Sequence, residues 1–423
     1  TGIETREIEG HDDFEVNYNA LMTAEERLET DMNVIKTGLT ARFKGKVKSA
    51  SGDYRDIEVA KYPISLNNGK PLVLALWRDI TSELATENTL RRTRILTKMA
   101  LRISDIRPDF IYMMEQAVKA PSGHNTQPWL FRVQKDRIQI LPDMSKSLPA
   151  VDPDNRELFI SLGCAVENLC IAASYFGYTT HIIECSIEAI VLELTKNDLT
   201  IEDSLFHQIE KRQTNRNIYN GNKISDGILQ QLQSIPKENG IQFYFTEINT
   251  PFANTITQYI MKGNEIQMAD IAFKNELLSW MRFNKKQVEA THNGLSYLVF
   301  GNPPLPRILA RPIVSLFLKP NTQNKSDRKK IDSSSHFVVC TTQRDTIEEW
   351  INLGRTLQRF LLKATEIGIS YAFLNQPCEV AVLAFDLRGK LPVNKEYPTL
   401  IMRIGYAKQI PYSPRKEIET LLV

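Results

Sequence analysis

The sequence is poor in features that mark secreted, metal-binding or membrane proteins. Its five cysteines contain no CxxC pair, which argues against a disulfide framework and a zinc site. None of the six histidines stands at metal-ligand spacing from a second ligand. The longest apolar stretch, 308–318, is broken by Arg311 and Pro312, whereas a membrane-spanning helix needs roughly 20 apolar residues. These absences favour a protein of the reducing cytoplasm that holds no metal and crosses no membrane.

A dominant charge and a leader are also missing. The 52 basic and 50 acidic residues leave a net charge of +2, so no overall field attracts nucleic acid. Thr1 stands where a methionine is usual, without a charged-then-apolar leader after it, so the sequence reads as a fragment. The length allows two to four domains, and the ordinary globular composition points to a small-molecule partner.

The segment 1–85 is rich in β-prone residues. Turn signals separate runs at 56–64 and 71–77, which predicts a short antiparallel sheet. The tripeptide Asp-Ile-Thr at 79–81 ends it, and with the features before it this ending resembles the second half of a PAS domain. The resemblance implies a linker helix, expected at 86–104. Because the opening PAS strands are absent, a spacer or dimer contact is as good an interpretation as a ligand-binding module.

One spaced pattern occurs twice in the rest of the chain. The segments 154–177 and 345–368 share an aspartate, an aromatic residue, a Leu-Gly pair, apolar residues and a closing glycine at identical offsets. The apolar residues line one helical stripe, and Gly177 and Gly368 stand where a C-cap belongs. A β-prone run follows each copy. We predict two copies of one buried helix in an α+β body with a pseudo-twofold axis.

A polar, turn-forming run occurs only in the first half, at 120–129, with the sequence Ala-Pro-Ser-Gly-His-Asn-Thr-Gln-Pro-Trp. Between an expected helix and an expected strand, such a loop can present N–H groups and short side chains to a flat polar heterocycle. The run is very similar to the Pro-Ser-x-x-Asn-x-Gln-Pro-Trp segment of nitroreductases, which lies against the flavin mononucleotide (FMN) bound by the partner subunit. The resemblance implies FMN contacts by Pro121, Ser122, Gly123, Asn125 and Gln127.

His124 stands inside this run and has two interpretations. It could donate a proton, but a histidine in such a loop is more often a backbone-bonded spacer. No convincing Ser/His/Asp or Cys/His arrangement is found elsewhere. We therefore expect no catalytic side chain, and the flavin would carry the chemistry.

The second half supplies a basic run, Arg-Gln-Thr-Asn-Arg at 212–216. Taken alone, such a run at a helix start is usually a surface feature, although arginine also offers a planar fork to phosphate. It corresponds to the Arg-x-Ser-x-Arg/Lys segment of nitroreductases. By that resemblance Arg212 is a phosphate ligand, Thr214 a hydroxyl ligand and Arg216 the cation near the pyrimidine edge, with Gln213 between them.

The C-terminal segment from 397 is similar to the last strand and phosphate-binding tail of nitroreductases. The resemblance assigns Gly405 and Arg415 to the cofactor site, with Arg415 as the second phosphate arginine. The basic residue that often stands two places before it is Ser413 here.

Asn375 and Gln376 stand where nitroreductases point backbone groups at the reactive edge of the ring. Their Asn-Gln-Pro tripeptide, with 152–158 and 280–282, looks most like the Acg-type branch of single-chain, duplicated nitroreductases. This implies an intramolecular pseudo-dimer with halves at 105–200 and 201–423. The second half has an extra segment, 250–335, which is either a lid or variable surface.

The reciprocal flavin site would need the segment 234–240, which lacks the donor pattern. One FMN per chain follows, in a monomer that imitates a dimer or in chains paired through the linker helix. The resemblance implies an oxidoreductase that passes electrons from NAD(P)H through FMN to a nitro, quinone or similar acceptor. The alternative is a PAS-linked flavin sensor or FMN storage module without turnover.

Overall fold

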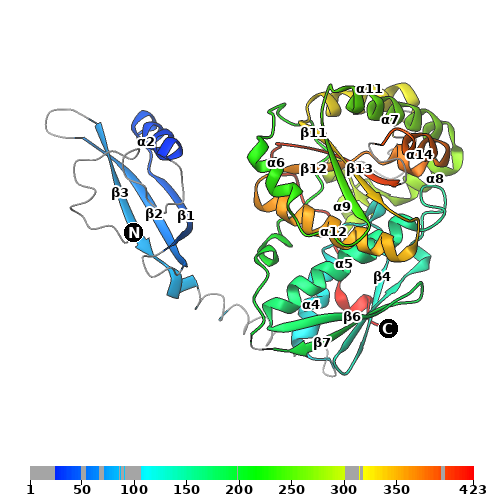
Figure 1. The fold of residues 1–423 in the computed structure, drawn as a ribbon, viewed down its shortest axis with the longest axis horizontal. Coiled ribbons are helices and arrows are strands. Elements are labelled where there is room, and N and C mark those ends of the chain that lie inside the picture. Colours follow the sequence, from blue (N-terminus) through cyan, green and yellow to red (C-terminus); the bar gives the residue numbers. More distant parts are fainter. Residues whose placement is uncertain are drawn as a thin grey trace. The chain divides into compact units, whose positions relative to one another are not determined.

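The computed structural model describes residues 24–48, 54–65, 71–84, 106–197, 199–300, 318–391 and 396–423, with the single residues 86, 90 and 314. The chain divides into two compact units, Thr1–Arg102 and Ile103–Val423, which are described one at a time (Figure 1). Apart from residues 86 and 90, the helix expected at 86–104 lies outside the described residues.

The first unit contains a three-stranded antiparallel sheet with one helix before it. Its elements are α2 (Ala24–Thr37), β1 (Ala41–Lys48), β2 (Tyr54–Ser65) and β3 (Pro71–Asp79), and the strand order is β1-β2-β3. Strands β2 and β3 confirm the two predicted runs. Thr81 ends the sheet, because its hydroxyl accepts the Asp56 N–H at 2.9 Å and its own N–H donates to Asp79 at 3.0 Å.

The second unit begins with a four-stranded antiparallel sheet. The elements are α4 (Pro108–Val118), η1 (Gly123–Asn125), β4 (Trp129–Gln134), β5 (Arg137–Pro142), η2 (Met144–Lys146), α5 (Arg156–Tyr175), β6 (Tyr178–Cys185) and β7 (Ile190–Lys196). The strand order is β4-β5-β7-β6. Pro108 suits the first position of α4, where its missing N–H costs nothing.

The second sheet of this unit has the same internal order. Its elements are η3 (Ser204–Gln208), α6 (Asp226–Gln233), β8 (Ile241–Glu247), β11 (His336–Thr342), α12 (Ile347–Glu366), β12 (Ser370–Phe373), α13 (Gln376–Glu379), α14 (Ala381–Arg388), β13 (Tyr397–Gly405) and η5 (Ile418–Thr420). The strand order is β8-β11-β13-β12. In both sheets the long helix therefore joins the second strand to the third, and the fourth strand inserts between those two.

The helices α5 and α12 lie between the two sheets (Figure 1) and touch at their glycines. A Cβ on Gly163 would lie 2.1 Å from the Ile351 oxygen, and one on Gly354 would lie 2.1 Å from the Ile160 oxygen. This close approach explains the glycine of each Leu-Gly pair. Gly177 (φ +72°) and Gly368 (φ +74°) follow the helix ends in the left-handed region, which confirms the predicted C-caps.

Helix α5 is the one helix, among the described residues, that is long and apolar enough to cross a membrane. Of the stretch that meets this test, 89% is buried inside the protein. The length and apolar composition of α5 are therefore explained by its burial in the protein core.

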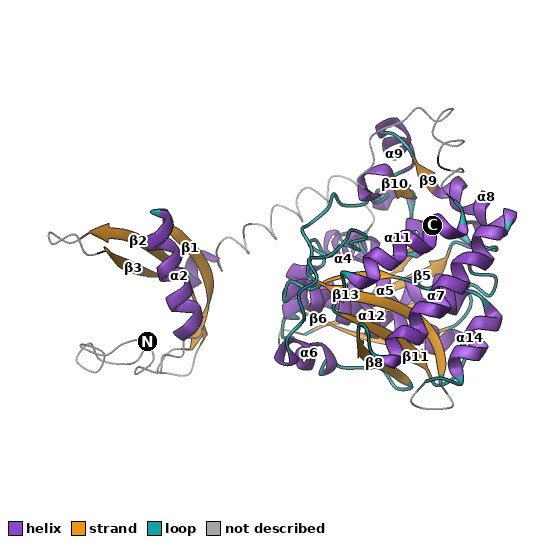
Figure 2. Cartoon of the chain, turned by 90° about the horizontal axis from the view of Figure 1, so that it is seen from above, coloured by secondary structure: helices purple, strands orange, loops and turns teal. Residues whose placement is uncertain are grey.

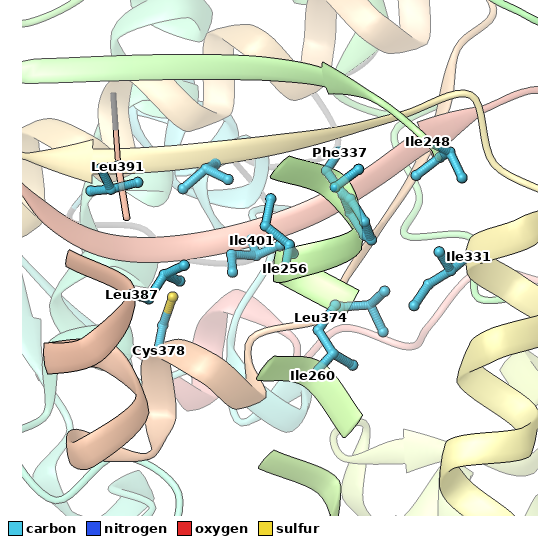
Figure 3. Packing of buried hydrophobic residues seen from close by; sticks show 12 residues of the cluster. Ile248, Ile256, Ile260, Ile331, Phe337, Leu374, Cys378, Leu387, Leu391 and Ile401 are labelled. Carbon is cyan, nitrogen blue, oxygen red and sulfur yellow. The ribbon is translucent and has the colours of Figure 1, made fainter. Parts of the chain in front are cut away.

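The extra segment between β8 and β11 is mainly helical. Its elements are α7 (Pro251–Ala269), α8 (Ile271–Trp280), β9 (Met281–Arg282), α9 (Lys285–Thr291), β10 (Leu295–Ser296), η4 (Tyr297–Phe300) and α11 (Pro320–Asp332). Figure 2 shows α7, α8 and α11 beside one another. In Figure 3, Ile256 and Ile260 of α7 and Ile331 of α11 pack toward Phe337 and Ile401 of the second sheet.

The opposite face of the second sheet packs on α12, where Phe243 and Phe360 meet edge to face at 5.4 Å. The sheet is thus buried on both sides. The C-terminal tail returns to β4 in the first of the two sheets of this unit. The Phe131 N–H donates to the Leu421 oxygen at 2.8 Å, and the Val423 N–H donates to the Phe131 oxygen at 3.0 Å. That return brings the tail beside the loop after α4.

Candidate functional site

Two adjoining cavities lie between the loop after α4 and the basic run 212–216. One has a volume of about 370 Å³ and the other about 310 Å³. We name them the wide cavity and the arginine cavity. They form one continuous cleft because five residues line both of them, namely Pro121, Ser122, Thr214, Arg216 and Leu295.

The arginine cavity holds two neighbouring guanidinium groups, those of Arg212 and Arg415. Both donate to the Lys119 carbonyl, at 3.2 and 3.3 Å, and Arg415 also donates to the Asn125 side chain at 3.0 Å. Burial, and then the charge of Arg212, lowers the pKa of Arg415 to about 9.

These two charges are not neutralised by the protein. Among the described residues neither arginine has a carboxylate within 4.0 Å, and the buried Nε atoms of both make no hydrogen bond. Glu210 also lines this cavity, but it pairs with Lys119 at 2.9 Å. A buried cation, Arg212, beside a half-buried one, Arg415, is costly without a counter-charge, so the arrangement suits an anion such as a phosphate.

The basic run is a coil between η3 and α6 rather than a helix start, with Arg212 and Asn215 buried and the other three residues half-buried. The Asn215 N–H donates to the Tyr371 oxygen at 2.9 Å, and its side chain donates to the Lys408 oxygen at 2.7 Å. Arg403 of β13 is fully buried and donates to the Asn217 oxygen at 2.7 Å. These bonds fix Arg216, which stands between Asn215 and Asn217.

The loop after α4 is held in an unusual backbone conformation. His124, Asn125 and Gln127 have φ of 48°, 55° and 55°, a left-handed region that costs a non-glycine residue about 1–3 kcal/mol. The Gln127 N–H donates to the Ser122 hydroxyl at 3.0 Å. The Asn125 side chain donates to the oxygens of Gly294 and Pro414, both at 3.2 Å, and so joins the loop to the extra segment and the tail.

The structure brings most of the expected cofactor residues to the cleft. Pro121, Ser122, Gly123, Thr214, Arg216, Asn375 and Gln376 line the wide cavity. Asn125, Arg212, Gln213 and Arg415 line the arginine cavity, together with Pro121, Ser122, Thr214 and Arg216.

Two expected residues, Gln127 and Gly405, line neither cavity. The Gln127 side chain is fully buried, donates to the His292 oxygen at 2.8 Å and accepts the Lys416 N–H at 2.9 Å. Gly405 backs the ring of Tyr219, since a Cβ there would lie 2.7 Å from that ring. Gln127 therefore joins its loop to the extra segment and to the tail.

Two acids that the sequence did not single out, Glu157 and Glu379, line the wide cavity. Asn375 donates to Glu157 at 3.0 Å, and Gln267 donates to Glu379 at 2.5 Å. Burial first, and the neighbouring Glu379 second, raises the pKa of Glu157 well above its usual value. Burial also raises the pKa of Glu379. Glu157 lies within the motif segment 152–158 and Glu379 follows the Asn-Gln-Pro motif, but only the fold shows that the two acids meet.

The extra segment supplies much of the wide cavity's wall. Its apolar contributors are Met268, Phe273, Leu277, Met281, Leu295, Phe300 and Leu318. Asp327 of α11 lies under the polar end, where Asn264 and Gln323 donate to it at 3.1 and 3.0 Å. Gln376 in turn donates to the Asn264 oxygen at 3.0 Å, so the extra segment also orients a predicted site residue.

Curated relatives share much of this chain at low identity. A Mycobacterium tuberculosis protein named "Putative NAD(P)H nitroreductase Rv3131" is 23% identical over 318 residues, covering 72% of this chain and 88% of the relative. A second one from the same organism, "Putative NAD(P)H nitroreductase acg", is 21% identical over 327 residues, covering 72% of this chain and 92% of the relative. The chain is thus similar to putative NAD(P)H nitroreductases of the Acg type. No protein-family model matches it.

Solved nitroreductases resemble the chain more weakly. The FMN-dependent nitroreductase NfnB of Mycobacterium smegmatis, solved with NADPH, has a TM-score of 0.31 and 10% identity, and the match covers 48% of the present chain and 86% of NfnB. NfnB of a Sphigopyxis strain has a TM-score of 0.33 and 13% identity, with 52% and 97% covered. At these values the likeness carries no weight for the site.

Proposed function

We propose that this protein is a nitroreductase-type oxidoreductase that holds one FMN in the cleft and passes electrons from NAD(P)H to a nitro, quinone or similar small acceptor. The observation that carries this proposal is the pair of buried Arg212 and half-buried Arg415, which lie beside the Pro-Ser loop without a counter-charge. A phosphate ester would satisfy both guanidinium groups, and the named relatives are nitroreductases.

The residues that line the cleft could bind the phosphate, the sugar chain and the ring of FMN in turn. Arg212 and Arg415 would hold the phosphate, and Ser122 and Thr214, which line both cavities, would lie along the sugar chain. Arg216 would place its charge by the ring, where it favours the reduced form. Bound FMN supplies hydride and electron transfer, while the apolar wall of the extra segment excludes water and holds the acceptor.

We also propose that the body is a tandem of two nitroreductase-like halves, 105–200 and 201–423, with a single cofactor site. The common strand order and the reciprocal glycine contact support the tandem. The matching place on the other side is occupied by an ion network. There Arg355, directly after Gly354, pairs with Glu167 at 3.0 Å and with Glu238 of the segment 234–240 at 2.5 Å.

A second function, FMN storage or sensing without turnover, is favoured by one observation. The segment 250–335 contributes helices α7, α8 and α11 to the wall of the wide cavity, as a lid over the ring would. In that case the PAS-like first unit would receive or send the signal, and the lid would keep NAD(P)H from the ring.

The visible absorbance spectrum of the purified chain with added FMN separates these functions. After anaerobic addition of NADPH or NADH, bleaching of bound FMN is the result expected of an oxidoreductase. Bound FMN that stays oxidised would favour storage or sensing. A chain that takes up no FMN would overturn both functions.

A further inference from the structure

The acids Glu157 and Glu379 lie at the end of the cleft that the two arginines leave free. Both acids line the wide cavity and neither lines the arginine cavity, whereas Arg212 and Arg415 line only the arginine cavity. With a phosphate in the arginine cavity, the remainder of the cofactor and the acceptor lie in the wide cavity. The two acids therefore face the part of the cleft where the reaction takes place.

Contacts between α5 and α13 bring the two acids together. Glu157 is the second residue of α5, and Glu379 is the last residue of α13. The residues before them also meet, because the Arg156 side chain donates to the Cys378 oxygen at 2.6 Å. Asn375 contacts both acids. Its side chain donates to Glu157 at 3.0 Å, and its carbonyl accepts the Glu379 N–H at 3.0 Å.

An amide holds one oxygen of each carboxyl group. Asn375 donates to Oε1 of Glu157, and Gln267 of α7 donates to Oε2 of Glu379 at 2.5 Å. Oε2 of Glu157 lies beside Gly123, where a Cβ would be 3.4 Å from it. Among the described residues, no amide, cation or hydroxyl group donates to the remaining oxygen of either acid. Both side chains are half-buried, and their open side faces the wide cavity.

Burial keeps a proton on this pair, because it disfavours the charged form of an acid. It is the first cause that raises the pKa of each acid, and the charge of Glu379 is the second cause for Glu157. A hydrogen bond from Glu157 lowers the pKa of Glu379, so Glu157 holds the proton and Glu379 accepts the bond. Asp152 raises both pKa values. One guanidinium group and two amides oppose the shifts, namely Arg156, Asn375 and Gln267.

Three other groups of the wide cavity are poorer proton donors. Burial lowers the pKa of His124 to about 4, so its ring carries no acidic proton at pH 7. Burial raises the pKa of the Cys164 thiol to about 12. Asp327 pairs with Lys330 at 3.0 Å and so serves as an acceptor. This leaves Glu157 as the best-placed acid.

We propose that the carboxyl group of Glu157 is the proton donor to the acceptor in the wide cavity, with Glu379 as its positioning partner. This inference rests on the proposed function. A quinone that has received a hydride on one oxygen carries a negative charge on the other. Glu157 donates to that second oxygen, so the O–H bond of the acid breaks, an O–H bond of the hydroquinone forms, and a carboxylate remains. NAD(P)H is the source of the hydride, and water returns the proton.

Rapid mixing of the FMN-loaded chain separates the two half-reactions. Bleaching by NADPH transfers a hydride and needs no proton from Glu157, so Glu157→Gln should leave its rate unchanged. Reoxidation by a naphthoquinone needs the proton and should slow roughly 100-fold, the low end for a lost general acid. Glu348→Gln is the matched control, because Glu348 is exposed at the same position of α12. It should alter neither rate.

Infrared spectroscopy of the FMN-free chain tests the proton itself. The carbonyl band of a protonated carboxylic acid should persist at pH 7 in the unchanged chain and in Glu348→Gln, and it should vanish in Glu157→Gln. Glu379→Gln removes the negative neighbour that helps to hold the proton. Its band should therefore titrate away at a lower pH than that of the unchanged chain. Absence of the band at pH 7 in the unchanged chain would overturn the inference.

The outcomes separate this inference from the proposed function. If NADPH bleaches bound FMN and Glu157→Gln is reoxidised as fast as the unchanged chain, the inference is wrong and the proposed function stands. If Glu157→Gln slows both half-reactions equally, its role is structural and the inference is also wrong. If no FMN binds, the proposed function fails, and this inference fails with it.

The unchanged chain decides the matter even if Glu157→Gln does not fold. Its reoxidation rate should fall as pH rises through the raised pKa of Glu157, because the donor is lost, while the rate of bleaching should not follow that profile. A reoxidation rate that does not fall over this range would overturn the inference.

Discussion

Matching positions in α5 and α12 have opposite surroundings. Cys164 follows Gly163 in α5 and lines the wide cavity, whereas Arg355 follows Gly354 in α12 and is paired with Glu167 at 3.0 Å. The glycine contact requires the same backbone approach on both sides. The side chain that follows each glycine is free to differ. A small thiol leaves room for a ligand, and a long paired arginine fills the matching space.

The largest expected effect on stability comes from Glu167→Gln, which breaks the ion network around Arg355. The Glu167 side chain is 1% exposed and pairs with Arg355 at 3.0 Å and Arg359 at 2.5 Å. Its loss leaves two arginines without their buried partner, and we expect the free energy of unfolding in urea to fall by about 3 kcal/mol. This is the low end for a broken buried pair, because Arg359 keeps Asp203 at 2.8 Å.

Glu238→Gln is the matched control for that experiment. Glu238 bonds the same Arg355, but its side chain is 35% exposed, so its loss should cost no more than about 1 kcal/mol. Equal costs for Glu167→Gln and Glu238→Gln would show that burial of the network does not matter. A gain in FMN stoichiometry in either variant would show that the network alone closes a second site.

A smaller effect, on FMN binding, is expected from Arg212→Met, which removes one charge from the arginine cavity. Charge-assisted hydrogen bonds contribute about 1.5–3 kcal/mol, so FMN affinity should fall roughly 10- to 150-fold. Riboflavin lacks the phosphate, and its affinity should change little. The ratio of the two dissociation constants is the measurement.

Arg137→Met of β5 is the control for Arg212→Met, because Arg137 is exposed and paired with Glu193 at 2.8 Å. It should alter neither affinity. If Arg212→Met weakened riboflavin as much as FMN, the arginine would be supporting the fold of the cleft and not binding the phosphate.

The smallest effect concerns the pH dependence of stability. The folded-state pKa of Glu157 is raised by burial and then by Glu379, with Asp152 adding to the shift and Arg156 opposing it. Folding therefore favours the protonated acid. Its contribution to stability is complete below the unfolded pKa of about 4.3 and is lost as pH rises through the raised folded pKa. Glu157→Gln should make unfolding in urea less sensitive to pH over that window.

Glu348→Gln provides the matched control, since Glu348 occupies the same helical position in α12 but is exposed. Its apoprotein should keep the pH dependence of the unchanged chain. If Glu157→Gln and Glu348→Gln gave the same pH profile, the acid wall of the wide cavity would not hold a proton in the folded state.

Local patterns predicted the regular elements well. The strands at 56–64 and 71–77 and the helices ending before Gly177 and Gly368 are present, because turn residues, apolar periodicity and C-caps act over a few neighbouring residues. The sequence also singled out the loop at 120–129 and the arginines of the cleft, because their residue types occur in a recognisable order.

Long-range consequences of folding were not predictable from the same patterns. Gln127 carries an amide that could bind a ligand. Its N–H group instead donates to His292 of the extra segment, and its oxygen accepts from Lys416 of the tail. Glu157 and Glu379 are 222 residues apart in the chain, and their raised pKa values arise from a burial that exists only after folding. The unbonded His124 nitrogen likewise depends on which partners the fold denies it.

The reciprocal glycine contact has a consequence for modularity. Each glycine leaves a gap in the surface of its helix that reaches the backbone. The other helix fills this gap, because Gly163 meets Ile351 and Gly354 meets Ile160. A half of the body expressed alone would expose that gap together with the apolar stripe of its helix, a surface that water disfavours and that another chain would cover. We therefore expect neither of the two proposed halves to fold stably when it is expressed without the other.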